Sequence, residues 1–583
     1  MIKSKNDPLS TMRHSAAHVL AAAVLKLYPK TKLGIGPAIE NGFYYDFEFE
    51  KPLSKEDLPK IEKEMAKIVK SNFPFIKKTA SLAEAKKLFK NQSYKQELIK
   101  DLESRGEKEV SLYQSGDFID LCAGPHLQST GKIGSFKLLS LAGAYWRGSE
   151  KNPMLTRIYG SAFPTKEELE NHLAQLAAAE ERDHRLLGKK LDLFSFHPDA
   201  APGDVFWHPK GYFLMKKLIE FWRQEHEKQG YGEVRTPEIL KNRVWRQSGH
   251  LKSFAEKMYQ VKTPDTNSWD ACVKPMNCDG GIMIYQSKLR SYRDLPLRLG
   301  EIGVVHRFEA SGELHGIIRT REFTQDDAHI FCRPDQVEEE IEKVINLCFY
   351  FYKAYGLKLD HLELSTRPEK SIGSDAIWEK AEKIMGKVLK ESGRPYQVNP
   401  GEGAFYGPKI DFHLRDSLGR TWQCSTIQLD FAQPENFNLS YIDEKGKKKR
   451  PVMIHRVIYG SLERFLGILI ENCGGAFPLW LSPVQAKIIP ISNKELSYSR
   501  NAFEKLKENN LRVELDDRSQ TASAKIRQAQ EEKIPYMIII GQKEEKNQTI
   551  NIRTREGKIL GEKKIEDFIK KAKREEAEKK DTN

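Results

Sequence analysis

The sequence predicts a multidomain protein that combines the α+β and α/β classes, and three observations support this prediction. Its 583 residues are too many for one hydrophobic core, because about 150 residues per domain gives roughly three or four units. In the centre, apolar and polar residues alternate on both sides of Ser311-Gly312, which indicates two antiparallel strands joined by a turn. Near the C-terminus, short apolar runs alternate with charged helical segments, which indicates a small α/β unit.

The N-terminal part, residues 1–164, mixes short helical segments with alternating strands such as 42–50, GFYYDFEFE. We therefore expect one compact α+β unit there. The next segment, 165–190, starts with Thr165 and Glu168 at the spacing of a capping box and continues with a helical period. It predicts a connecting helix.

A large central unit is expected over residues 191–480, with an irregular, proline-rich entry and a first helix over about 212–228. The last unit, 481–583, should contain a largely parallel sheet. Its final residues, 571–583, are almost all charged, and we expect them to fray. Strands of this unit are predicted at 484–491, 511–515 and 535–541, and helices at 495–508 and 522–532.

Composition restricts the class of protein. A net charge of +13 and a pI near 9.0 favour a polyanionic partner. The seven cysteines are scattered, without a CxxC pair, so we expect no disulfides and a cytoplasmic location. The apolar run VLAAAVL could instead be the core of a secretory signal peptide. His18 and Lys26, which flank the run, disfavour this alternative. Since no stretch approaches the ~20 apolar residues that cross a bilayer, membrane insertion is not expected.

Polar side chains are concentrated between the two central strands. Planar, bidentate arginine suits a phosphate-bearing substrate. Arg307 and Arg319 on the strand pair are candidates, and Arg464, four residues after Gly460, is another. The alternative is that each arginine is an ordinary solvated charge. The stretch Leu297 to Cys332 contains Arg307, Glu309, Arg319, Arg321, Gln325, Asp326, Asp327 and His329.

A second group of chemically active residues lies in the N-terminal unit. His14 and His18, in RHSAAH, are one helical turn apart, and Cys122 and His126, in DLCAGPH, are able to face them. Three histidines and a cysteine are a suitable tetrahedral zinc set. Unconnected core residues are the alternative, and the residues alone leave both open.

Several motifs resemble a known family. HRFE, with Arg307 and Glu309, is similar to motif 2 of class II aminoacyl-tRNA synthetases, GSLERF, with Arg464, to motif 3, and the segment at Arg235-Thr236-Pro237 to motif 1. Over essentially the whole chain, KPMNC, GELHG, FTQDDAHIF, AFYGPKIDF, QCSTIQLDF and MIHRVIYGSLERF together resemble the threonyl-tRNA synthetase family.

The resemblance implies an N-terminal α+β editing domain, a linker helix, a class II catalytic domain built on an antiparallel sheet, and a C-terminal α/β anticodon-binding domain. It implies ATP-dependent ligation of L-threonine to tRNA(Thr) through threonyl-adenylate, with hydrolytic editing of seryl-tRNA(Thr). Mg²⁺ would accompany ATP, and no protein nucleophile is needed because positioning and charge neutralisation supply the acceleration.

The same resemblance implies roles for residues of the ATP and amino-acid site. Arg307 would contact the α-phosphate and the amino-acid carboxylate, and Arg319 and Arg464 the terminal phosphates. The catalytic residues would be Arg307, Gln325 and Arg464, and the substrate-binding set adds Met276, Glu309, Arg319, Asp327, Tyr406, Gln423, Gln428 and Ser461.

Cys278, His329 and His455 correspond to the family's zinc ligands, which implies one Zn²⁺ per subunit with an open coordination position. Such an ion takes the amino and hydroxyl groups of threonine and rejects valine, which an apolar pocket separates only about a hundredfold. The family usually continues Cys-Pro-Gly-His, whereas Asp279, Gly280 and Gly281 follow the cysteine here. The changed surroundings put metal affinity in question.

Serine carries the same two groups as threonine in a smaller body, so a second, hydrolytic site is needed. The N-terminal motifs resemble the family's editing domain, which is thought to work without metal. The resemblance therefore implies water attack on seryl-tRNA, with substrate and water positioned by His14, His18, Tyr45, Asp120, Cys122 and His126.

The C-terminal unit resembles the family's anticodon-binding domain, which implies that Glu544 and Arg553 read anticodon edges. Lys525, Arg527 and Arg555 are further candidates for RNA contact. Motif 1 implies a homodimer. Because the chain begins almost directly at the editing motif, we expect the family's N-terminal ubiquitin-like module to be absent.

Two other interpretations compete with this one. A sister synthetase for proline or serine is disfavoured by the combination of Cys278, His329 and His455. A non-catalytic RNA-binding relative would normally have lost a phosphate-binding arginine, and Arg307 and Arg464 are both retained.

Overall fold

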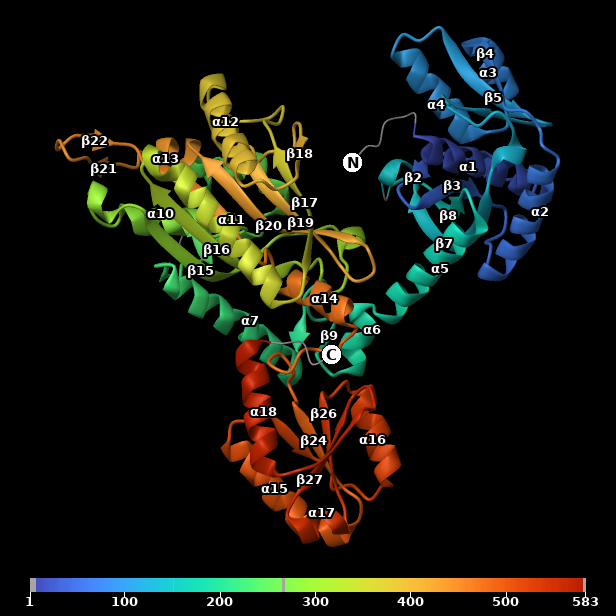
Figure 1. Cartoon of the computed structure of the whole chain (residues 1–583). Coiled ribbons are helices and arrows are strands. Elements are labelled where there is room, and N and C mark those ends of the chain that lie inside the picture. Colours follow the sequence, from blue (N-terminus) through green and yellow to red (C-terminus); the bar gives the residue numbers. More distant parts are fainter. Residues whose placement is uncertain (1–6, 150, 265–267, 580–583) are drawn as a thin grey trace. The chain divides into compact units, whose positions relative to one another are not determined.

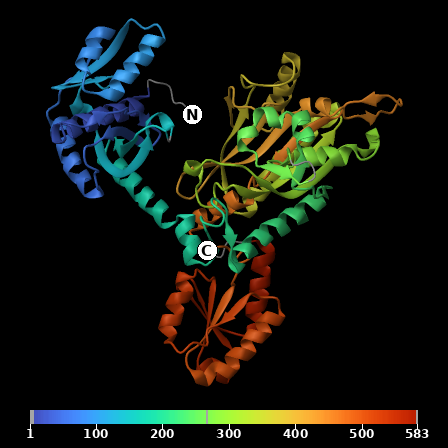
Figure 2. The ribbon, with the colours of Figure 1, turned by 180° about the vertical axis from the view of Figure 1, so that it is seen from behind.

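A computed structural model describes residues 7–149, 151–264 and 268–579. It divides into two compact units, residues 1–178 and 179–583, each with its own hydrophobic core. Figures 1 and 2 show the chain from opposite sides. Of the helices in the described ranges, none combines the length and the apolarity that crossing a membrane requires.

The first unit is built on a five-stranded antiparallel sheet in the order β1-β3-β8-β7, with β2 paired to β3. Side chains of α1 (Pro8–Leu27) and α2 (Leu58–Lys70), such as Leu20 and Ile61, pack with Phe43, Phe47 and Ile158 of the sheet. The strands are β1 (Lys32–Leu33), β2 (Ala38–Ile39), β3 (Gly42–Glu48), β7 (Ser135–Tyr145) and β8 (Met154–Phe163). The strand predicted at 42–50 is therefore present as β3.

A smaller layer completes this unit. Its antiparallel sheet, β4-β5-β6, packs with α3 and α4 around Ala85, Phe89, Ile99 and Leu112. The elements are β4 (Ile76–Ser81), α3 (Leu82–Leu88), α4 (Ser93–Ser104), β5 (Glu109–Ser115) and β6 (Phe118–Leu121).

The connecting helix predicted over 165–190 is two helices, α5 (Lys166–Glu181) and α6 (His184–Lys190). The capping box is present, because the Glu168 side chain accepts from the Thr165 N–H at 3.1 Å and the Thr165 hydroxyl accepts from the Glu168 N–H at 3.2 Å. The helix is interrupted where Asp183 caps α6 by accepting from the Arg185 N–H at 2.7 Å.

The second unit contains an eight-stranded sheet in the order β11-β15-β16-β23-β20-β19-β17-β18. Its inner neighbours are antiparallel, and only the outer pairs, β11 with β15 and β17 with β18, are parallel in the described ranges. The strands are β11 (Gly232–Glu233), β15 (Leu297–His306), β16 (Glu322–Cys332), β17 (Lys358–Ser365), β18 (Tyr396–Asn399), β19 (Lys409–Arg415), β20 (Thr421–Asp430) and β23 (Val452–Val457).

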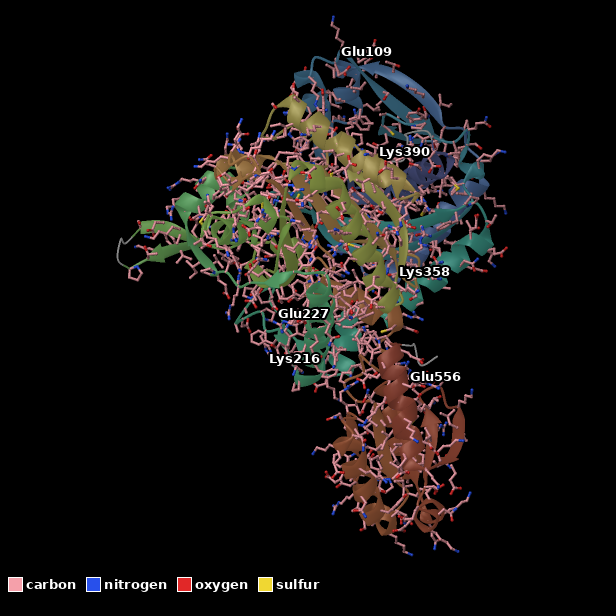
Figure 3. The ribbon with its side chains drawn as sticks, turned by 60° about the vertical axis from the view of Figure 1, so that its left-hand side comes forward. Glu109, Lys216, Glu227, Lys358, Lys390 and Glu556 are labelled. Atoms are coloured by element: carbon pink, nitrogen blue, oxygen red, sulfur yellow. The ribbon has the colours of Figure 1, made fainter. Side chains whose placement is uncertain are left out.

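Helices cover one face of this sheet. Because alternate residues of a strand point to opposite faces, Ile410, Phe412 and Leu414 of β19 enter the core, whereas Asp411 and His413 lie on the other face. The covering helices are α7 (Pro209–Lys228), α11 (Val337–Ala354), α12 (Asp375–Glu391) and α14 (Leu462–Cys473), and Figure 3 labels Glu227 on α7 and Lys390 on α12. The first helix thus begins at residue 209, three residues before the predicted start.

Short helices and small sheets complete the part of the chain over residues 191–480. The remaining α-helices in residues 191–480 are α8 (Asn242–Ser248), α9 (His250–Ser253), α10 (Cys278–Gln286) and α13 (Ala432–Asn436). Its small sheets are β12 (Ile239–Lys241) with β14 (Ser268–Val273) and β13 (Gln260–Thr263), β9 (Phe194–Ser195) with β10 (Phe206–Trp207), and β21 (Tyr441–Ile442) with β22 (Lys448–Lys449).

The C-terminal part has a sheet in the order β25-β24-β26-β27-β28, in which the first three strands are parallel and the last two antiparallel. All the predicted strands and helices are present. They are β24 (Ala486–Pro490), α15 (Leu496–Glu508), β25 (Val513–Leu515), α16 (Ala522–Glu531) and β26 (Tyr536–Ile540), followed by α17 (Gln542–Asn547), β27 (Ile550–Thr554), β28 (Ile559–Lys563) and α18 (Ile565–Glu578).

The expectation that residues 571–583 fray is wrong for the described ones. Residues 571–578 belong to α18, Ala572 is buried, and Glu575 accepts a hydrogen bond from the Tyr536 hydroxyl at 2.8 Å. Arg512 contacts Glu576 at 2.9 Å. A high density of charged residues indicates a solvated segment, but here residues of other elements bind the side chains of α18 and hold the helix in place. Residues 580–583 lie outside the described ranges.

Candidate active sites

The two strands predicted around the Ser311-Gly312 turn are present as β15 and β16, paired from Leu297↔Phe331 to His306↔Glu322. Gln325, Asp327 and His329 alternate along β16 and share its uncovered face. His455 of β23 lies directly opposite His329. The floor expected from the alternation therefore exists.

Two adjoining hollows occupy this floor, and both are lined by Arg307, Gln325, Gln423, Thr426 and Val457. Every residue that the resemblance assigns to threonine, ATP or zinc lines at least one of them. The first, called the inner hollow, is also lined by Met276, Cys278, Asp327, His329, Tyr406, Gln428 and His455. The second, called the outer hollow, is also lined by Glu309, Arg319, Ser461 and Arg464.

Arg307 is held at the junction of the two hollows. Its Nε donates to the Pro275 carbonyl at 3.1 Å, and its guanidinium lies 5.1 Å from the Phe323 ring and 5.5 Å from the Phe254 ring. Burial lowers its pKa, while Asp327 and Glu309 act in the opposite direction. A cation held among aromatic rings with few anionic partners is well prepared to bind an anionic ligand.

Glu309 is the centre of a charged cluster at the outer hollow. Its carboxylate accepts from Lys257 Nζ at 2.8 Å and from Arg319 Nη2 at 3.0 Å, and Arg319 also lies 3.3 Å from Glu313. Burial acts to raise the pKa of Glu309, but the bonds from Lys257 and Arg319 lower it to about 2. To contact a phosphate, as the resemblance implies, Arg319 would have to share or exchange these carboxylates.

The second arginine site depends on the start of α14. Ser461 caps this helix by accepting from the Arg464 N–H at 3.2 Å. The Arg464 Nε is buried without a hydrogen-bond partner in the described structure, and its side chain lines the outer hollow. A buried donor without a partner is costly, which favours an acceptor supplied by a ligand.

Asp326 anchors the turn that leads into α14. Its carboxylate accepts from the backbone N–H groups of Ile458, Tyr459 and Gly460 at 2.9, 3.0 and 3.0 Å. Burial raises its pKa to about 7, although Arg456 and these N–H groups oppose the shift. The sequence analysis included Asp326 among the polar residues of this stretch but assigned it no role, because its hydrogen-bond partners lie more than 130 positions away in the sequence.

The residues assigned to zinc line the inner hollow together. The His329 and His455 rings are perpendicular with centroids 5.1 Å apart, and His455 Nε2 lies 2.8 Å from Asp430 Oδ2. Burial, His455 and Arg456 hold the pKa of His329 well below its usual value, which keeps the imidazole neutral. Burial, followed by Asp279, Asp327 and Asp430, raises the pKa of the Cys278 thiol well above its usual value.

Cys278 has two close neighbours, Asp279, which follows it in the sequence, and His250, which the sequence analysis missed. Its ligand atom and those of His250 and Asp279 lie within 4.8 Å of one another, and all three residues are buried. His250 Nδ1 lies 2.7 Å from the Ser248 hydroxyl and 3.6 Å from Asp279. The carboxylate that replaces the family's proline therefore lies beside the cysteine that the resemblance assigns to zinc.

Hydrogen bonds orient the amides and carboxylates of the amino-acid pocket. Asp327 accepts from Asn277 Nδ2 at 2.9 Å, and the Tyr406 hydroxyl bonds to Gln428. Gln423 Nε2 donates to Asp411 Oδ1 at 2.6 Å. Burial raises the pKa of Asp327, while Asn277 and His455 oppose the rise. No local sequence signal identified Asn277 or Asp411, because each acts through a partner on another element.

The N-terminal group converges into one site. Cys122 Sγ lies 3.3 Å from both His14 Nε2 and His126 Nε2, and the His18 and His126 ring centroids are 4.1 Å apart. The ligand atoms of all four residues lie within 4.8 Å of one another. The alternative of unconnected core residues is therefore wrong.

The floor of this site is a buried network that includes a residue not expected from the sequence. Asp120 accepts from the Tyr45 hydroxyl at 2.5 Å and pairs with Lys95 Nζ at 2.7 Å, while His18 Nε2 lies 4.0 Å away. Lys95 is 2 % exposed and also donates to Tyr45 at 3.0 Å. A lysine on a charged helix gives no sequence sign of burial.

Burial keeps the reactive groups of this site uncharged. It lowers the pKa values of His14, His18 and His126, and for His18 and His126 the neighbouring histidines lower them further. Burial also raises the pKa of the Cys122 thiol to about 11. Near neutral pH the site therefore offers neutral imidazoles and a thiol rather than a thiolate.

In the C-terminal part, the predicted RNA contacts differ in their surroundings. Glu544 caps α17 by accepting from the Gly541 N–H at 3.0 Å, and Arg553, on β27, has a buried Nε without a partner in the described ranges. Lys525 is buried and donates to the Asp516 carbonyl at 2.9 Å. Arg555 is buried and donates to the Phe477 carbonyl at 2.6 Å, so neither of these two is on the surface.

The antiparallel sheet, with arginines on its hairpin and on the helix that follows its last strand, defines a class II aminoacyl-tRNA synthetase. Residues 259–473 match the tRNA synthetase class II core domain (G, H, P, S and T). Residues 485–575 match the anticodon binding domain, and residues 110–159 match the threonyl and alanyl tRNA synthetase second additional domain.

The chain belongs to the threonine–tRNA ligase family. It is 54% identical to the threonine–tRNA ligase of Acetivibrio thermocellus, over 96% of this chain and 87% of that protein. It is also 54% identical to that of Caldanaerobacter subterraneus, over 97% and 87%. A crystal structure of the RNA binding domain of threonyl-tRNA synthetase from Cryptosporidium parvum is 40% identical, with a TM-score of 0.65 over 67% of this chain and 98% of that one.

Proposed function

We propose that this protein ligates L-threonine to tRNA(Thr) through threonyl-adenylate and hydrolyses seryl-tRNA(Thr) at its N-terminal site. Membership of the family supports the first reaction, and the match of residues 110–159 supports editing. The observation that carries the proposal is the pair of adjoining hollows, in which phosphate-binding and amino-acid-binding residues share Arg307 and Gln325.

In adenylate formation, the threonine carboxylate attacks the α-phosphate of ATP and pyrophosphate leaves. Arg307 lies where the two hollows meet, so it suits both the carboxylate and the α-phosphate. Arg464 and Arg319 line the outer hollow, where they would neutralise pyrophosphate together with Mg²⁺. Positioning and charge neutralisation lower the barrier, and no covalent enzyme intermediate is required.

Cys278, His329 and His455 fit a zinc ion by their chemistry, since two buried imidazoles and a thiol are suitable donors and His329 is held neutral. When bound, the ion would supply Lewis-acid recognition of the amino and hydroxyl groups of threonine. Asp430 would orient His455 through their 2.8 Å contact, and Asp327 would accept the substrate hydroxyl. Valine lacks that hydroxyl and has no group that donates to Asp327.

At the editing site, neutral His14, His18 and His126 suit the positioning of water against the ester of seryl-tRNA. The protonated Cys122 is a weak nucleophile, which favours direct attack by water over a covalent thioester route. The Lys95–Asp120–Tyr45 network would hold the floor of the pocket. The same four ligand groups also suit a metal, and chelator resistance of the hydrolysis distinguishes the two possibilities.

The partners follow from the same arrangement. The C-terminal part would bind the tRNA anticodon through Glu544 and Arg553. We propose a homodimer, and exposed Ile239, Trp269 and Leu289, at 55, 63 and 73 %, support a contact surface in the catalytic part. Sedimentation at micromolar concentration tests it. The seven cysteines, none in a disulfide, support a cytoplasmic location.

The decisive experiment measures amino-acid-dependent exchange between ATP and pyrophosphate with threonine, serine and valine. Exchange should be strong with threonine, weaker with serine and more than a hundredfold weaker with valine. A chelator should abolish it, and Zn²⁺ should restore it. Equal exchange with valine, or full activity of metal-free protein, would contradict the proposed recognition.

A further inference from the structure

A second group of metal-type ligands lies on the uncovered face of the large sheet, outside the residues assigned to either reaction. It consists of His361, Glu363 and His413, whose ligand atoms lie within 4.8 Å of one another. His361 and Glu363 are two residues apart on β17, which begins at the Lys358 labelled in Figure 3, and His413 is the direct cross-strand partner of His361 on β19. Strand geometry therefore points all three side chains the same way.

The local geometry matches that of a metal centre. The two imidazole rings are stacked nearly parallel, with centroids 4.5 Å apart and an interplanar angle of 4°. His361 Nε2 forms a hydrogen bond with Glu363 Oε1 at 3.1 Å, and His413 Nε2 lies 3.2 Å from Glu363 Oε2. Bonds of about 2.0–2.1 Å place tetrahedral ligand atoms roughly 3.3 Å apart, close to these separations.

In the described structure, one ring nitrogen of His413 lacks a hydrogen bond. His413 Nε2 is buried and makes no aligned hydrogen bond in the described structure, although it faces the Glu363 carboxylate.

The surrounding residues orient two of the three ligands. His361 Nδ1 lies 2.9 Å from Asp360 Oδ2, which directs Nε2 toward the group, and Asp360 is itself held by Arg415 Nε at 2.7 Å. Asn399 Nδ2 donates to Glu363 Oε2 at 3.2 Å. A carboxylate behind a histidine is the usual support of a metal-bound imidazole.

We propose that His361, Glu363 and His413 bind a divalent metal ion, preferably Zn²⁺, and that water completes its coordination. The side chains are 17, 15 and 17 % exposed, so an ion has access from solvent. Two imidazoles and one carboxylate with an open position suit Zn²⁺ and other borderline cations rather than Mg²⁺.

This site is distinct from the proposed zinc site of the amino-acid pocket. It shares no ligand with Cys278, His329 and His455, and it lies across β17 and β19 rather than β16 and β23. His413 is the register partner of Gln423, which lines both hollows. A metal here would bridge two strands at the edge of the pocket face and stabilise their pairing.

The test is a calorimetric titration of the chelator-stripped full-length protein with Zn²⁺, repeated for His413→Asn, His361→Asn and Glu363→Gln. Each variant should bind one ion per chain fewer than the wild type. Titration with Co²⁺ adds a spectroscopic signature, because this site contains no sulfur. The visible cobalt bands lost in the variants should be ligand-field bands, while thiolate-to-cobalt absorption from cysteine sites stays unchanged.

The matched control is His172→Asn, which removes a half-buried histidine that lies 3.2 Å from the Ser161 hydroxyl and belongs to none of the ligand groups. It should bind as many ions as the wild type. Glu363→Gln keeps the size of the side chain, so a binding loss in this variant, with an unchanged Tm of the stripped protein, excludes misfolding as the cause. Equal ion counts in the wild type and all three variants would overturn the proposal.

Discussion

At the scale of single residues, both candidate sites depend on burial that removes charge. His14, His18, His126 and His329 all have lowered pKa values because they are buried, so they act as neutral imidazoles. Neutral imidazole is the form that accepts a proton from water or binds a metal. The sequence supplied the residue types, but their charge states follow from the surroundings.

Replacing His14 and His18 together by alanine should slow hydrolysis of seryl-tRNA(Thr) about a hundredfold, since positioned proton acceptors typically contribute at least that much. Threonine-dependent exchange should stay unchanged, because the first unit has its own core. The measurement is deacylation of labelled seryl-tRNA alongside pyrophosphate exchange. Clearance at the wild-type rate would show that the editing assignment is wrong.

The Cys122 thiol should react slowly with iodoacetamide in metal-free protein. With a pKa raised to about 11, only about one thousandth is thiolate at pH 8, against roughly a quarter for an ordinary cysteine of pKa about 8.5. The alkylation rate should therefore rise about tenfold per pH unit up to pH 10. Mass spectrometry of the modified peptide follows it, with half-buried Cys473 as an internal comparison. A rate that levels off near pH 8 would contradict the shift.

At the scale of elements, the proposed ATP site depends on a strand that anchors a helix. Asp326 of β16 binds three consecutive N–H groups ahead of α14, and Glu463 of α14 accepts from the Thr324 N–H at 2.8 Å in return. The two contacts set the position of Ser461 and Arg464 relative to Gln325, which forms a bridge with Ser461.

Asp326→Ala should therefore impair adenylate formation although Asp326 does not line either hollow. Three N–H groups lose their acceptor, and a cost of about 3 kcal/mol corresponds to roughly a hundredfold lower exchange. The KM for ATP should rise, because the helix that carries Arg464 is misplaced. Asp326→Asn keeps one acceptor oxygen and should be less impaired. An unchanged KM in the alanine variant, with folding verified by circular dichroism, would refute the anchoring role.

At the scale of the whole molecule, the two units have separate cores, and the second contains the complete set of residues assigned to threonine, ATP and zinc. The first contains the residues that the resemblance assigns to editing. Activation and proofreading are therefore expected to be separable functions of one chain.

A fragment of residues 179–583 should activate threonine at a rate within a few-fold of that of the full chain and should accumulate seryl-tRNA. The comparison is made by pyrophosphate exchange and by serine charging of tRNA(Thr), with the full-length protein and its His14→Ala/His18→Ala variant as references. Loss of threonine activation by a folded fragment would show that the units depend on each other.

Much of the fold follows from local sequence patterns. Alternation predicted β15, β16 and the strands of the C-terminal part, and the Thr165–Glu168 capping box predicted the start of α5, because these signals depend on neighbours within a few residues. The motifs also identified residues that line the two hollows. For α18 the local charge pattern was misleading, since its partners lie on other elements.

The sequence by itself determined which elements form and which residue types are available for chemistry, because period and capping are local properties. Only the tertiary structure decided that Lys95 lies buried against Asp120, that Asp326 holds the turn before α14, and that Lys525 and Arg555 are buried. It also placed His361 beside His413. The physical reason is that burial and pairing between distant residues arise from packing, which no local pattern records.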